Sequence, residues 1–378
     1  MRILLIDQFG ESGGAQRGLV DAAAGFAERG WELHAALPSG PLAGLLAPWC
    51  RTIIPLVCGP FSSVRKSLAD LARFSFQFRR QTAAIRRVID RESIDVLYVN
   101  GPRMAPAAVW ARQGRPVVFH AHSIVTQPLA ARLTGQVLRV PEVTLLASSQ
   151  FVARWLESIA TGRSARVIYN GIDSAGARSQ PRETFTRVAV LGRIAPEKGQ
   201  LAFARAARIA IARNPGLSFC IAGAPMFSGR EYLDAVRSAA DRAVEFTGWT
   251  DDVGGWLRQV DLLVVPSDTV DANPRVIPEA YAAGVPVLAF DGGGIPELID
   301  HGVTGLLVKQ HTPEALAEAI LDAVADPQRL NKIAERGHAR WQRCYTVPRY
   351  QSEVCDALEG AMGRREGPVA KARASATA

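Results

Sequence analysis

Cysteine is scarce in this sequence, and long apolar runs are missing. The five cysteines are scattered, without a CxxC pair or a cluster with histidine, so no zinc site is expected and a reducing compartment is favoured. No run of about 18 apolar residues occurs, which argues against a membrane-spanning helix. The start, MRILLIDQFG, turns polar too early for a signal peptide. These absences predict a cytoplasmic protein.

Acidic residues are outnumbered by basic ones. The 378 residues carry a net charge of +8, with a pI of about 9.6. Such a balance favours anionic partners, whether nucleotides, nucleic acid or anionic lipid surfaces, without choosing among them. No helix-turn-helix pattern or aromatic stacking platform is present, so nucleic acid is not expected as a partner.

Short apolar runs alternate with amphipathic stretches along the chain, as in RILLID at 2–7, DVLYVN at 95–100 and RVAVLGR at 187–193. This alternation predicts an α/β protein with parallel sheets that are covered by helices on both faces. The segment NGIDSAGARSQPRETFT, rich in Gly, Ser, Pro and Thr, is typical of a linker. We therefore expect two doubly wound, Rossmann-like domains that face each other across a cleft.

These patterns also give domain boundaries. The first domain is expected at 1–170 and the second at 171–345. The helical segment 346–362 is a candidate to cross back to the first domain. The basic tail at 363–378 has little to bury and is expected to be disordered.

One segment, SVRKSLADLARFSFQFRRQTAAIRRVIDRE at 63–92, mixes arginines and lysines with leucines and phenylalanines. A basic amphipathic surface of this kind can bind an anionic membrane. A solvated helix that packs on its own domain has the same pattern. The sequence leaves both interpretations open.

Two glycines follow the first apolar run, in QFGESGGAQRGL. This segment lacks both GxxxxGK[ST] and GxGxxG. Gly13 and Gly14 stand where a strand should lead into a helix, and glycines there let the backbone approach an anion at the helix N-terminus. A tight turn without a ligand would need the same residues.

Two histidines, His120 and His122 in PVVFHAHS, fall at the end of another expected strand. Residues two apart lie on one face of a strand, yet no third metal ligand is evident. We expect one of them to contact a substrate. For each histidine taken alone, a buried and hydrogen-bonded side chain is the alternative.

Two cations, Arg193 and Lys198 in LGRIAPEKGQ, bracket a turn after an expected strand. Two positive charges at a strand end can neutralise a diphosphate without a metal ion. Surface charge without a ligand is the other interpretation.

The segment SDTVDANPRVIPEAYAAG starts a helix among prolines and carboxylates. A helix that begins near Arg275 or Val276 places Pro278 in its first turn, where proline is tolerated. The N–H groups of Arg275, Val276 and Ile277 would then remain free for phosphate or sugar oxygens. The following glycine-rich turn, DGGGIPELI, should lie beside this segment.

GRIAPEKG, together with VPSDTVDANPRVIPEAYAAGVPVLAFDGGGIPELIDHGVTGLLV, closely resembles the donor domain of family 4 retaining glycosyltransferases with the GT-B fold. VIYNGID at 167–173 is similar to the interdomain segment of that family, and FGESGGAQRGL to its N-terminal glycine loop. The resemblance covers about 1–350. The combined donor-domain motifs are its most specific part.

The resemblance implies roles for named residues. The Glu-x7-Glu signature of the family is here Asp271-x7-Glu279. Glu279 would hold the ribose hydroxyls, since a carboxylate accepts two hydroxyl protons, and Asp271, one methylene shorter than glutamate, would contact the sugar. Arg193 and Lys198 would hold the diphosphate, and His122 would be the active-site histidine, with His120 as the alternative. The donor site would further include Gly13, Gly14, Asn273, Arg275, Val276, Ile277, Gly293 and Glu297.

The implied reaction transfers a sugar, with retention, from a nucleotide-sugar to a hydroxyl of a glycan or lipid-linked acceptor in cell-envelope polysaccharide synthesis. The resemblance implies no metal, no cofactor and no enzyme nucleophile. The cysteine usage and the basic segment 63–92 lead us to expect a protein that is cytoplasmic, or peripheral on the inner face of the plasma membrane. A nucleotide-sugar epimerase, another GT-B enzyme and a non-catalytic protein that binds an anionic ligand are the alternatives.

Overall fold

The structure is a computed structural model that describes residues 1–59, 68–174, 176, 180–225, 230–240, 242–267 and 271–363, with side chains from 76 onward in the second range. The chain divides into two units. Unit 1 comprises Met1–Gly171 and Val347–Ala378, and unit 2 comprises Ile172–Thr346. Each break lies one residue after the boundary expected from the sequence. The expected disordered tail lies, from residue 364 on, outside the described residues.

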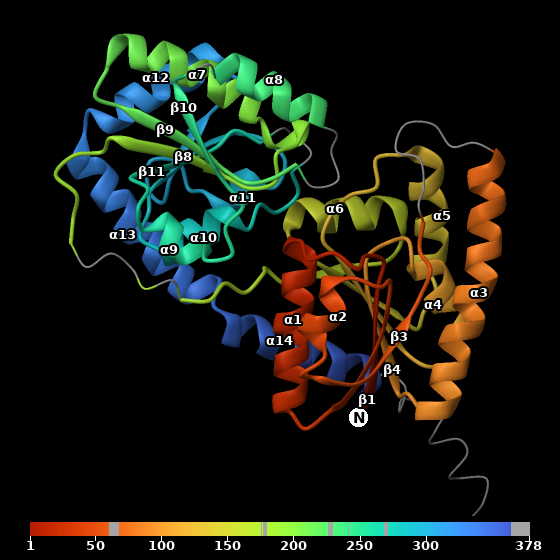
Figure 1. Cartoon of the computed structure of the whole chain (residues 1–378). Helices are drawn as coiled ribbons and strands as arrows, with labels where there is room; N and C mark the ends of the chain where they lie inside the picture. Colours follow the sequence, from red (N-terminus) through yellow and green to blue (C-terminus); the bar gives the residue numbers. More distant parts are fainter. Residues whose placement is uncertain are drawn as a thin grey trace, which may run out of the picture. The chain divides into compact units, whose positions relative to one another are not determined.

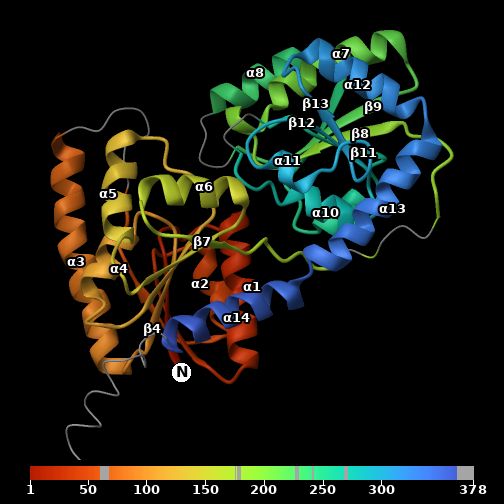
Figure 2. The ribbon, with the colours of Figure 1, turned by 180° about the vertical axis from the view of Figure 1, so that it is seen from behind.

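Unit 1 contains a seven-stranded parallel sheet with the order β3-β2-β1-β4-β5-β6-β7. Its strands are β1 (Arg2–Asp7), β2 (Glu32–Leu37), β3 (Cys50–Pro55), β4 (Val96–Asn100), β5 (Val117–Ala121), β6 (Val143–Ala147) and β7 (Ala165–Val167). Its helices are α1 (Gly14–Glu28), α2 (Pro41–Leu46), α3 (Leu68–Glu92), α4 (Ala105–Ala111), α5 (Pro128–Leu138), α6 (Gln150–Ile159) and α14 (Val347–Gly363). Helices α1 and α14 cover one face of the sheet, and α3, α4 and α5 cover the other (Figures 1 and 2).

The C-terminal helix α14 is part of the unit 1 core. Tyr350, Val354 and Leu358 are buried together with apolar side chains of α1 and of the central strands. The Tyr350 hydroxyl donates to the Gly18 carbonyl at 3.1 Å. A Cβ atom on Gly25 would overlap a side chain of α14, so this glycine lets the two helices pack closely. The predicted helical segment 346–362 is thus α14, and it follows α13 after a break at 345–346, where the chain passes from one unit to the other.

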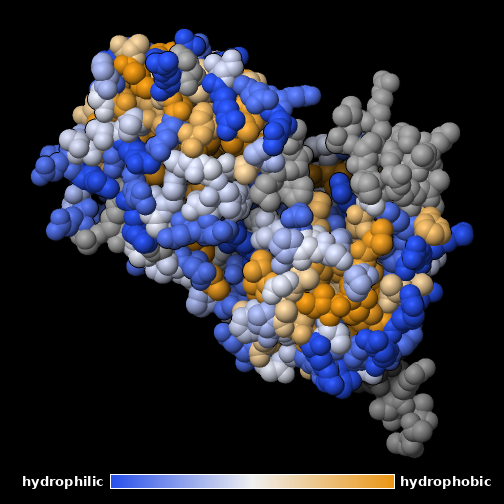
Figure 3. All heavy atoms as spheres, viewed as in Figure 1, coloured by the Kyte–Doolittle hydropathy of each residue, from blue (hydrophilic) through white to orange (hydrophobic). Residues whose placement is uncertain are grey.

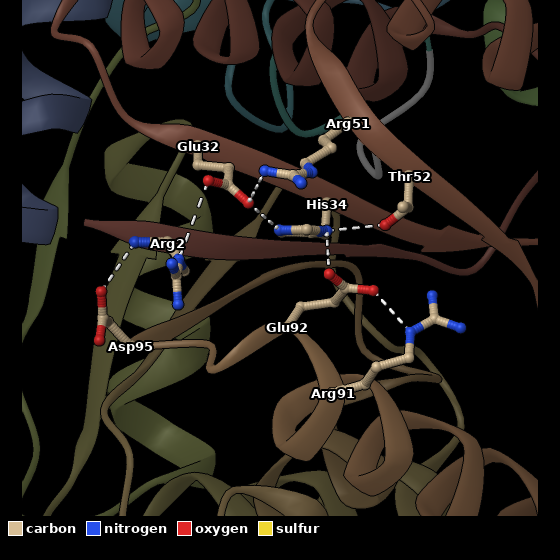
Figure 4. A network of polar contacts seen from close by, with 8 residues as sticks. All are labelled: Arg2, Glu32, His34, Arg51, Thr52, Arg91, Glu92 and Asp95. Carbon is tan, nitrogen blue, oxygen red and sulfur yellow. Dashed lines mark hydrogen bonds and ion pairs between the residues drawn. The ribbon is translucent and has the colours of Figure 1, made fainter.

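The last turn of α3 is held to the sheet by a polar network (Figure 4). His34 on β2 is buried, with Nδ1 2.7 Å from the Thr52 hydroxyl and Nε2 3.1 Å from a Glu32 oxygen. Glu92, near the end of α3, approaches the same imidazole at 4.0 Å and accepts a hydrogen bond from Arg91 at 2.6 Å. The network fixes the C-terminal end of α3.

Unit 2 contains a six-stranded parallel sheet with the order β10-β9-β8-β11-β12-β13. Its strands are β8 (Arg187–Leu191), β9 (Ser218–Ala222), β10 (Val244–Gly248), β11 (Leu262–Val265), β12 (Val287–Phe290) and β13 (Leu306–Val308). Its helices are η1 (Pro196–Lys198), α7 (Gln200–Arg213), α8 (Arg230–Ala240), α9 (Val253–Leu257), α10 (Val276–Ala282), α11 (Ile295–Leu298), α12 (Pro313–Val324) and α13 (Pro327–Cys344). Helices α7, α8 and α12 cover one face, and α10 and α13 the other (Figures 1 and 2).

Both sheets confirm the predicted doubly wound α/β class. In each sheet the strand order reverses once, between β1 and β4 in unit 1 and between β8 and β11 in unit 2. Open α/β sheets bind ligands beyond the carboxyl ends of the strands at such a switch point. Among the described residues, no helix has the length and apolar character needed to cross a bilayer.

Candidate active site

The switch point of unit 2 brings two predicted site residues together. Lys198, at the end of η1, places its Nζ 2.7 Å from Oδ2 of Asp271, in the loop after β11. The two side chains are 24% and 10% exposed. Gly199 makes this approach possible, because its φ is +70° and a Cβ there would overlap the Pro266 carbonyl. The sequence predicted both residues but not that they pair.

Arg193 lies in the loop after β8. Its guanidinium forms an ion pair with Glu197 at 3.1 Å, a partner that the sequence did not single out. Its carbonyl accepts a hydrogen bond at 2.7 Å from Gln200, whose side chain is buried at the start of α7. The loop that carries both predicted diphosphate cations is therefore fixed at both ends.

Helix α10 begins at Val276, with Arg275 at the N-cap position and Pro278 in the first turn, as the sequence predicted. The Arg275 guanidinium lies 3.7 Å from Oε1 of Glu279, so this predicted acid too has a cation beside it. The prediction for Ile277 was wrong: its N–H donates to the Pro274 carbonyl at 3.2 Å, and its side chain is buried. A tight turn ahead of the helix uses the donor that we expected to remain free.

The glycine-rich turn after β12 lies against the loop that carries Asp271. The N–H of Gly294 donates to the Asp271 carbonyl at 2.9 Å, and a Cβ on Gly294 would overlap the Ala272 carbonyl. Gly293 has φ +59°, and the Glu297 carbonyl on α11 accepts a hydrogen bond from Arg340 at 2.9 Å. Asn273 lies in the same loop as Asp271, just before α10. The expected neighbouring loops are thus side by side.

The remaining predicted residues belong to unit 1. Gly13 is the N-cap residue of α1 and Gly14 its first residue, without a side-chain cap. His122 follows β5, with its ring 4.2 Å from that of His120. His120 is buried, its Nδ1 lies 2.6 Å from the Tyr98 hydroxyl, and burial holds its pKa well below the usual range. His120 therefore matches the alternative of a buried, hydrogen-bonded histidine, whereas His122 stands at the strand end.

Sequence reasoning missed a buried polar group at the switch point of unit 1. Asp7, the last residue of β1, is fully buried and accepts hydrogen bonds from the side chains of Gln16 and Asn100. Burial raises the pKa of the Asp7 carboxyl to about 6. The signal was present, because RILLID ends an apolar strand on an acid at the point where open sheets bind ligands.

Two family models match the chain. The model described as Glycosyltransferase Family 4 matches residues 12–175, and the model described as Glycosyl transferases group 1 matches residues 186–326. The chain belongs to the family 4, group 1 glycosyltransferases. It is an enzyme of that class, with the GT-B fold that the sequence predicted.

Individual relatives resemble this glycosyltransferase over most of its length. A GDP-mannose-dependent alpha-(1-6)-phosphatidylinositol monomannoside mannosyltransferase of Mycobacterium tuberculosis is 26% identical over 293 residues, 68% of this chain and 75% of the relative. An exopolysaccharide phosphotransferase of Streptomyces coelicolor is 27% identical over 319 residues, 76% of this chain. The chain spans about a third of that relative, 34% of its length.

A solved structure shows the same fold. Anabaena HepE, in complex with UDP and glucose, matches this glycosyltransferase with a TM-score of 0.78 at 25% identity. The match covers 95% of this chain and 100% of that chain. In this fold the predicted site residues form two groups. One is at the unit 2 switch point, and the other, made of the glycine loop and His122, is in unit 1.

Proposed function

We propose that this glycosyltransferase moves a sugar from a nucleotide-sugar to a hydroxyl group of a glycan or lipid-linked acceptor, with retention of the anomeric configuration. We place the reaction in the synthesis of a cell-envelope polysaccharide, lipopolysaccharide or exopolysaccharide. The observation that carries the proposal is the Lys198–Asp271 pair, 2.7 Å apart at the switch point of unit 2. A cation and an acid there suit a ligand that has both phosphates and hydroxyl groups.

The cations would serve the leaving group. Transfer breaks the bond between the sugar and the diphosphate, and the departing oxygen gains negative charge. Lys198 and Arg193 stand where they can stabilise that charge. In the structure each is paired with an acid, Asp271 for the lysine and Glu197 for the arginine. A bound diphosphate would replace those acids as the partner.

The acids would hold hydroxyl groups. Glu279 sits in the first turn of α10, and an ionised carboxylate can accept from both ribose hydroxyls at once. Asp271 would be released toward the sugar when the diphosphate takes over Lys198. His122, in unit 1, would contact the transferred sugar. In a front-face displacement the leaving phosphate assists the incoming hydroxyl, so no side chain is assigned as a nucleophile.

The proposal includes catalysis without a resident metal, because Lys198 and Arg193 supply the positive charge that a divalent ion would otherwise give. Enzyme treated with EDTA is expected to keep its turnover. A loss of turnover that Mg²⁺ or Mn²⁺ restores would contradict this part of the proposal.

A donor screen tests the function. The names of the relatives include both GDP-mannose and UDP with glucose, so the screen spans UDP-, GDP- and ADP-sugars. A donor at a hundred times its Kd should raise the unfolding free energy by about 2.7 kcal/mol, which thermal unfolding detects. Release of nucleoside diphosphate with an acceptor then measures turnover, and NMR of the product gives the anomeric configuration.

The outcomes separate the alternatives. Conversion of the nucleotide-sugar without any acceptor would indicate an epimerase. An inverted product would overturn retention alone. A protein that neither binds nor turns over any donor in the screen would overturn the proposed function.

We further propose that the enzyme binds an anionic membrane surface through unit 1, on the cytoplasmic side. The sequence left this role open for 63–92, of which 63–67 lie outside the described residues. In the described part of α3, Phe76 is 61% exposed, and on α4 Trp110 is 67% exposed. Exposed arginines flank them on α3: Arg79, Arg80, Arg86 and Arg87.

A groove of about 390 Å³ supports this surface. It is lined by Arg79, Arg86 and Trp110 together with three smaller or apolar residues. Leu129, on the adjacent α5, is 71% exposed. Arginines around exposed aromatic and aliphatic side chains suit anionic headgroups above acyl chains. In Figure 3, which shows the side of unit 1 that carries α1 and α2, apolar side chains also gather among hydrophilic ones at lower right.

Vesicle sedimentation tests the membrane proposal. Vesicles with phosphatidylglycerol should bind the enzyme, and vesicles of phosphatidylcholine alone should not. Trp110→Ala should weaken binding, whereas Trp249→Ala removes an exposed tryptophan of unit 2 and serves as the matched control. Equal binding by both variants, or no preference for anionic lipid, would contradict the proposal.

A further inference from the structure

Polar side chains that the proposed reaction does not use form one row across the unit 1 sheet. Asp7 of β1 is paired in register with Asn100 of β4, which is paired with His120 of β5. All three side chains are buried. They lie at the carboxyl ends of their strands, at the switch point of the sheet. We refer to these residues as the polar row.

Asp7 is the most highly connected member of the polar row. Gln16 Nε2 lies 3.2 Å from both carboxylate oxygens, and Asn100 Nδ2 donates to Oδ2 at 2.5 Å. The N–H of Phe9 donates to Oδ1 at 2.8 Å. These donors are uncharged and come from α1, β4 and the loop after β1. One carboxylate therefore joins three elements.

These bonds hold the glycine loop. Gln16 is in the first turn of α1, two residues after Gly14. The Asn100 amide also lies 3.4 Å from the Ala15 carbonyl. A Cβ on Gly13 would meet the Gln16 oxygen at 3.1 Å, so the same side chain borders the loop. A shift of Asp7 would move the start of α1 and the loop with it.

The other end of the row supports His122. The rings of His120 and His122 lie 4.2 Å apart, and the Tyr98 hydroxyl is 2.6 Å from His120 Nδ1. Burial raises the pKa of Tyr98 and lowers that of His120, so both are neutral. Tyr98 then donates to Nδ1, and His120 carries its proton on Nε2. The ring behind His122 is thus fixed in orientation and charge.

Asp7 destabilises the fold that contains it. Burial raises the pKa of its carboxyl to about 6, so at neutral pH a charge is retained in the interior with uncharged hydrogen-bond donors only. Costly polar groups of this kind are retained where a site needs them. The position of Asp7, at the switch point and beside the glycine loop, indicates which site that is.

We propose that Asp7 is a positioning residue for sugar transfer: its ionised carboxylate fixes the Gly13–Gly14 loop, and Asn100 and His120 extend the support to His122. The inference rests on the proposed function, in which the loop and His122 contact the substrates. A proton added to Asp7 would compete with the donors that its oxygens now accept from, Gln16, Asn100 and Phe9. One donor must then move away, which loosens the loop. Turnover should therefore fall as the pH drops through about 6.

Other titrating groups face Asp7 from the elements around it. Tyr98 on β4 and Cys58 after β3 interact with its charge, and Arg103 lies near Cys58. Burial raises the pKa of the tyrosine and of the cysteine, so neither loses a proton near pH 6. The imidazole of His122, beside His120, is a second titratable group at the polar row.

The test measures kcat and KM of the full chain from pH 5 to 9 with the donor found in the screen. Asp7→Asn keeps the shape but not the charge. Its kcat at pH 8 should fall about tenfold or more, as for a misplaced contact group, and the acid limb should disappear. The KM for the donor should change by less than about threefold, because its binding groups on unit 2 are untouched.

A second variant separates Asp7 from His122. Gln16→Met removes a hydrogen bond to the ionised carboxylate, which raises the pKa of Asp7 and should move the acid limb to higher pH. An unmoved limb would assign the titration to His122 and overturn the inference. This variant also carries the test if Asp7→Asn fails to fold.

The matched control is Asp261→Asn in unit 2. Asp261 is also buried and accepts backbone N–H bonds from Thr186 at 3.0 Å and Arg187 at 2.9 Å. This variant should lose stability and keep the wild-type pH profile. An Asp7→Asn variant with wild-type kcat and acid limb would overturn the inference while the proposed function stands. A wild-type enzyme without turnover would instead overturn the proposed function.

Discussion

The two units place different chemistry at the same point of the same topology. Each sheet reverses its strand order once, and each has an aspartate there. In unit 1, Asp7 is fully buried and held by uncharged donors. In unit 2, Asp271 is paired with the ammonium of Lys198, and both side chains reach solvent.

The difference separates a supporting group from a binding group. An ion pair that solvent reaches contributes little to stability, so a ligand can replace one partner at small cost. A buried carboxylate whose oxygens are already occupied has no such freedom. An acid at a switch point therefore indicates a binding site when it is paired with a charged, accessible partner. A fully buried acid with uncharged donors there indicates a residue that positions its neighbours.

The largest expected effect comes from removing the Lys198 ammonium at the switch point of unit 2. Lys198→Ala should lower kcat by about 10²–10³-fold, because stabilisation of the leaving diphosphate is lost. The unfolding free energy should change little, since the ammonium is partly exposed. Lys332→Ala, which removes an exposed lysine of α13, is the control. Turnover that survives in Lys198→Ala would remove this residue from the site.

The buried Asp7 should make the unfolding free energy depend on pH. Its native pKa of about 6 exceeds the unfolded value near 3.8, so the native state keeps a proton that the unfolded state releases. The stabilising contribution is complete below the unfolded value and is lost as the pH rises through 6. The unfolding free energy of the wild type, relative to Asp7→Asn, should fall by roughly 2 kcal/mol between pH 4 and 7. Urea unfolding at several pH values measures it, and a constant difference would contradict it.

The hydroxyl-binding acid should act on donor affinity. Glu279→Ala should weaken donor binding by roughly 1–3 kcal/mol, about ten- to hundredfold, because hydrogen bonds to a charged group are lost. Calorimetric titration with the identified nucleotide-sugar gives the Kd. Glu318→Gln, in a surface pair with Arg213 on α7 and α12, should bind normally. Unchanged affinity in Glu279→Ala would transfer the ribose role to another group.

The smallest expected effect concerns the shortened acid. Asp271→Glu restores the usual residue of the signature and can still pair with Lys198, so its kcat should stay within about threefold of the wild type. Asp271→Asn removes the charge and should lower kcat by about tenfold. Equal activity of both variants would show that the charge at 271 is not used.

The central strands of both sheets could be predicted because they are buried on both faces and form apolar runs. The edge strands β3, β7 and β10 were not predicted. Residues of β3 and β10 are largely half-buried or exposed, and β7 has three residues, so none of them forms a clear apolar run. The last helix was predicted at 346–362 and is α14, which begins at Val347 and ends at Gly363.

The sequence identified residues of the site but not which of them contact one another. Loops rich in glycine and proline mark Lys198 and Asp271 individually, but their pairing spans 73 positions and depends on how β8 and β11 align. Asp7 was missed because RILLID shows only an acid at a strand end, whereas its hydrogen bond depends on Asn100 of β4, 93 positions later. The prediction that the Ile277 N–H would stay free was wrong, because this N–H donates to the Pro274 carbonyl in a local turn.

The position of α14 at the end of the chain affects the order in which the two units can fold during synthesis. Unit 1 takes its last helix from Val347–Gly363, after all of unit 2 has been synthesised. Until then the surface that will receive Tyr350, Val354 and Leu358 has nothing to cover it. Unit 2, whose residues are continuous in sequence, can fold as soon as it emerges from the ribosome. The ribosome therefore begins unit 1 first, yet unit 1 is the last of the two units to complete its fold.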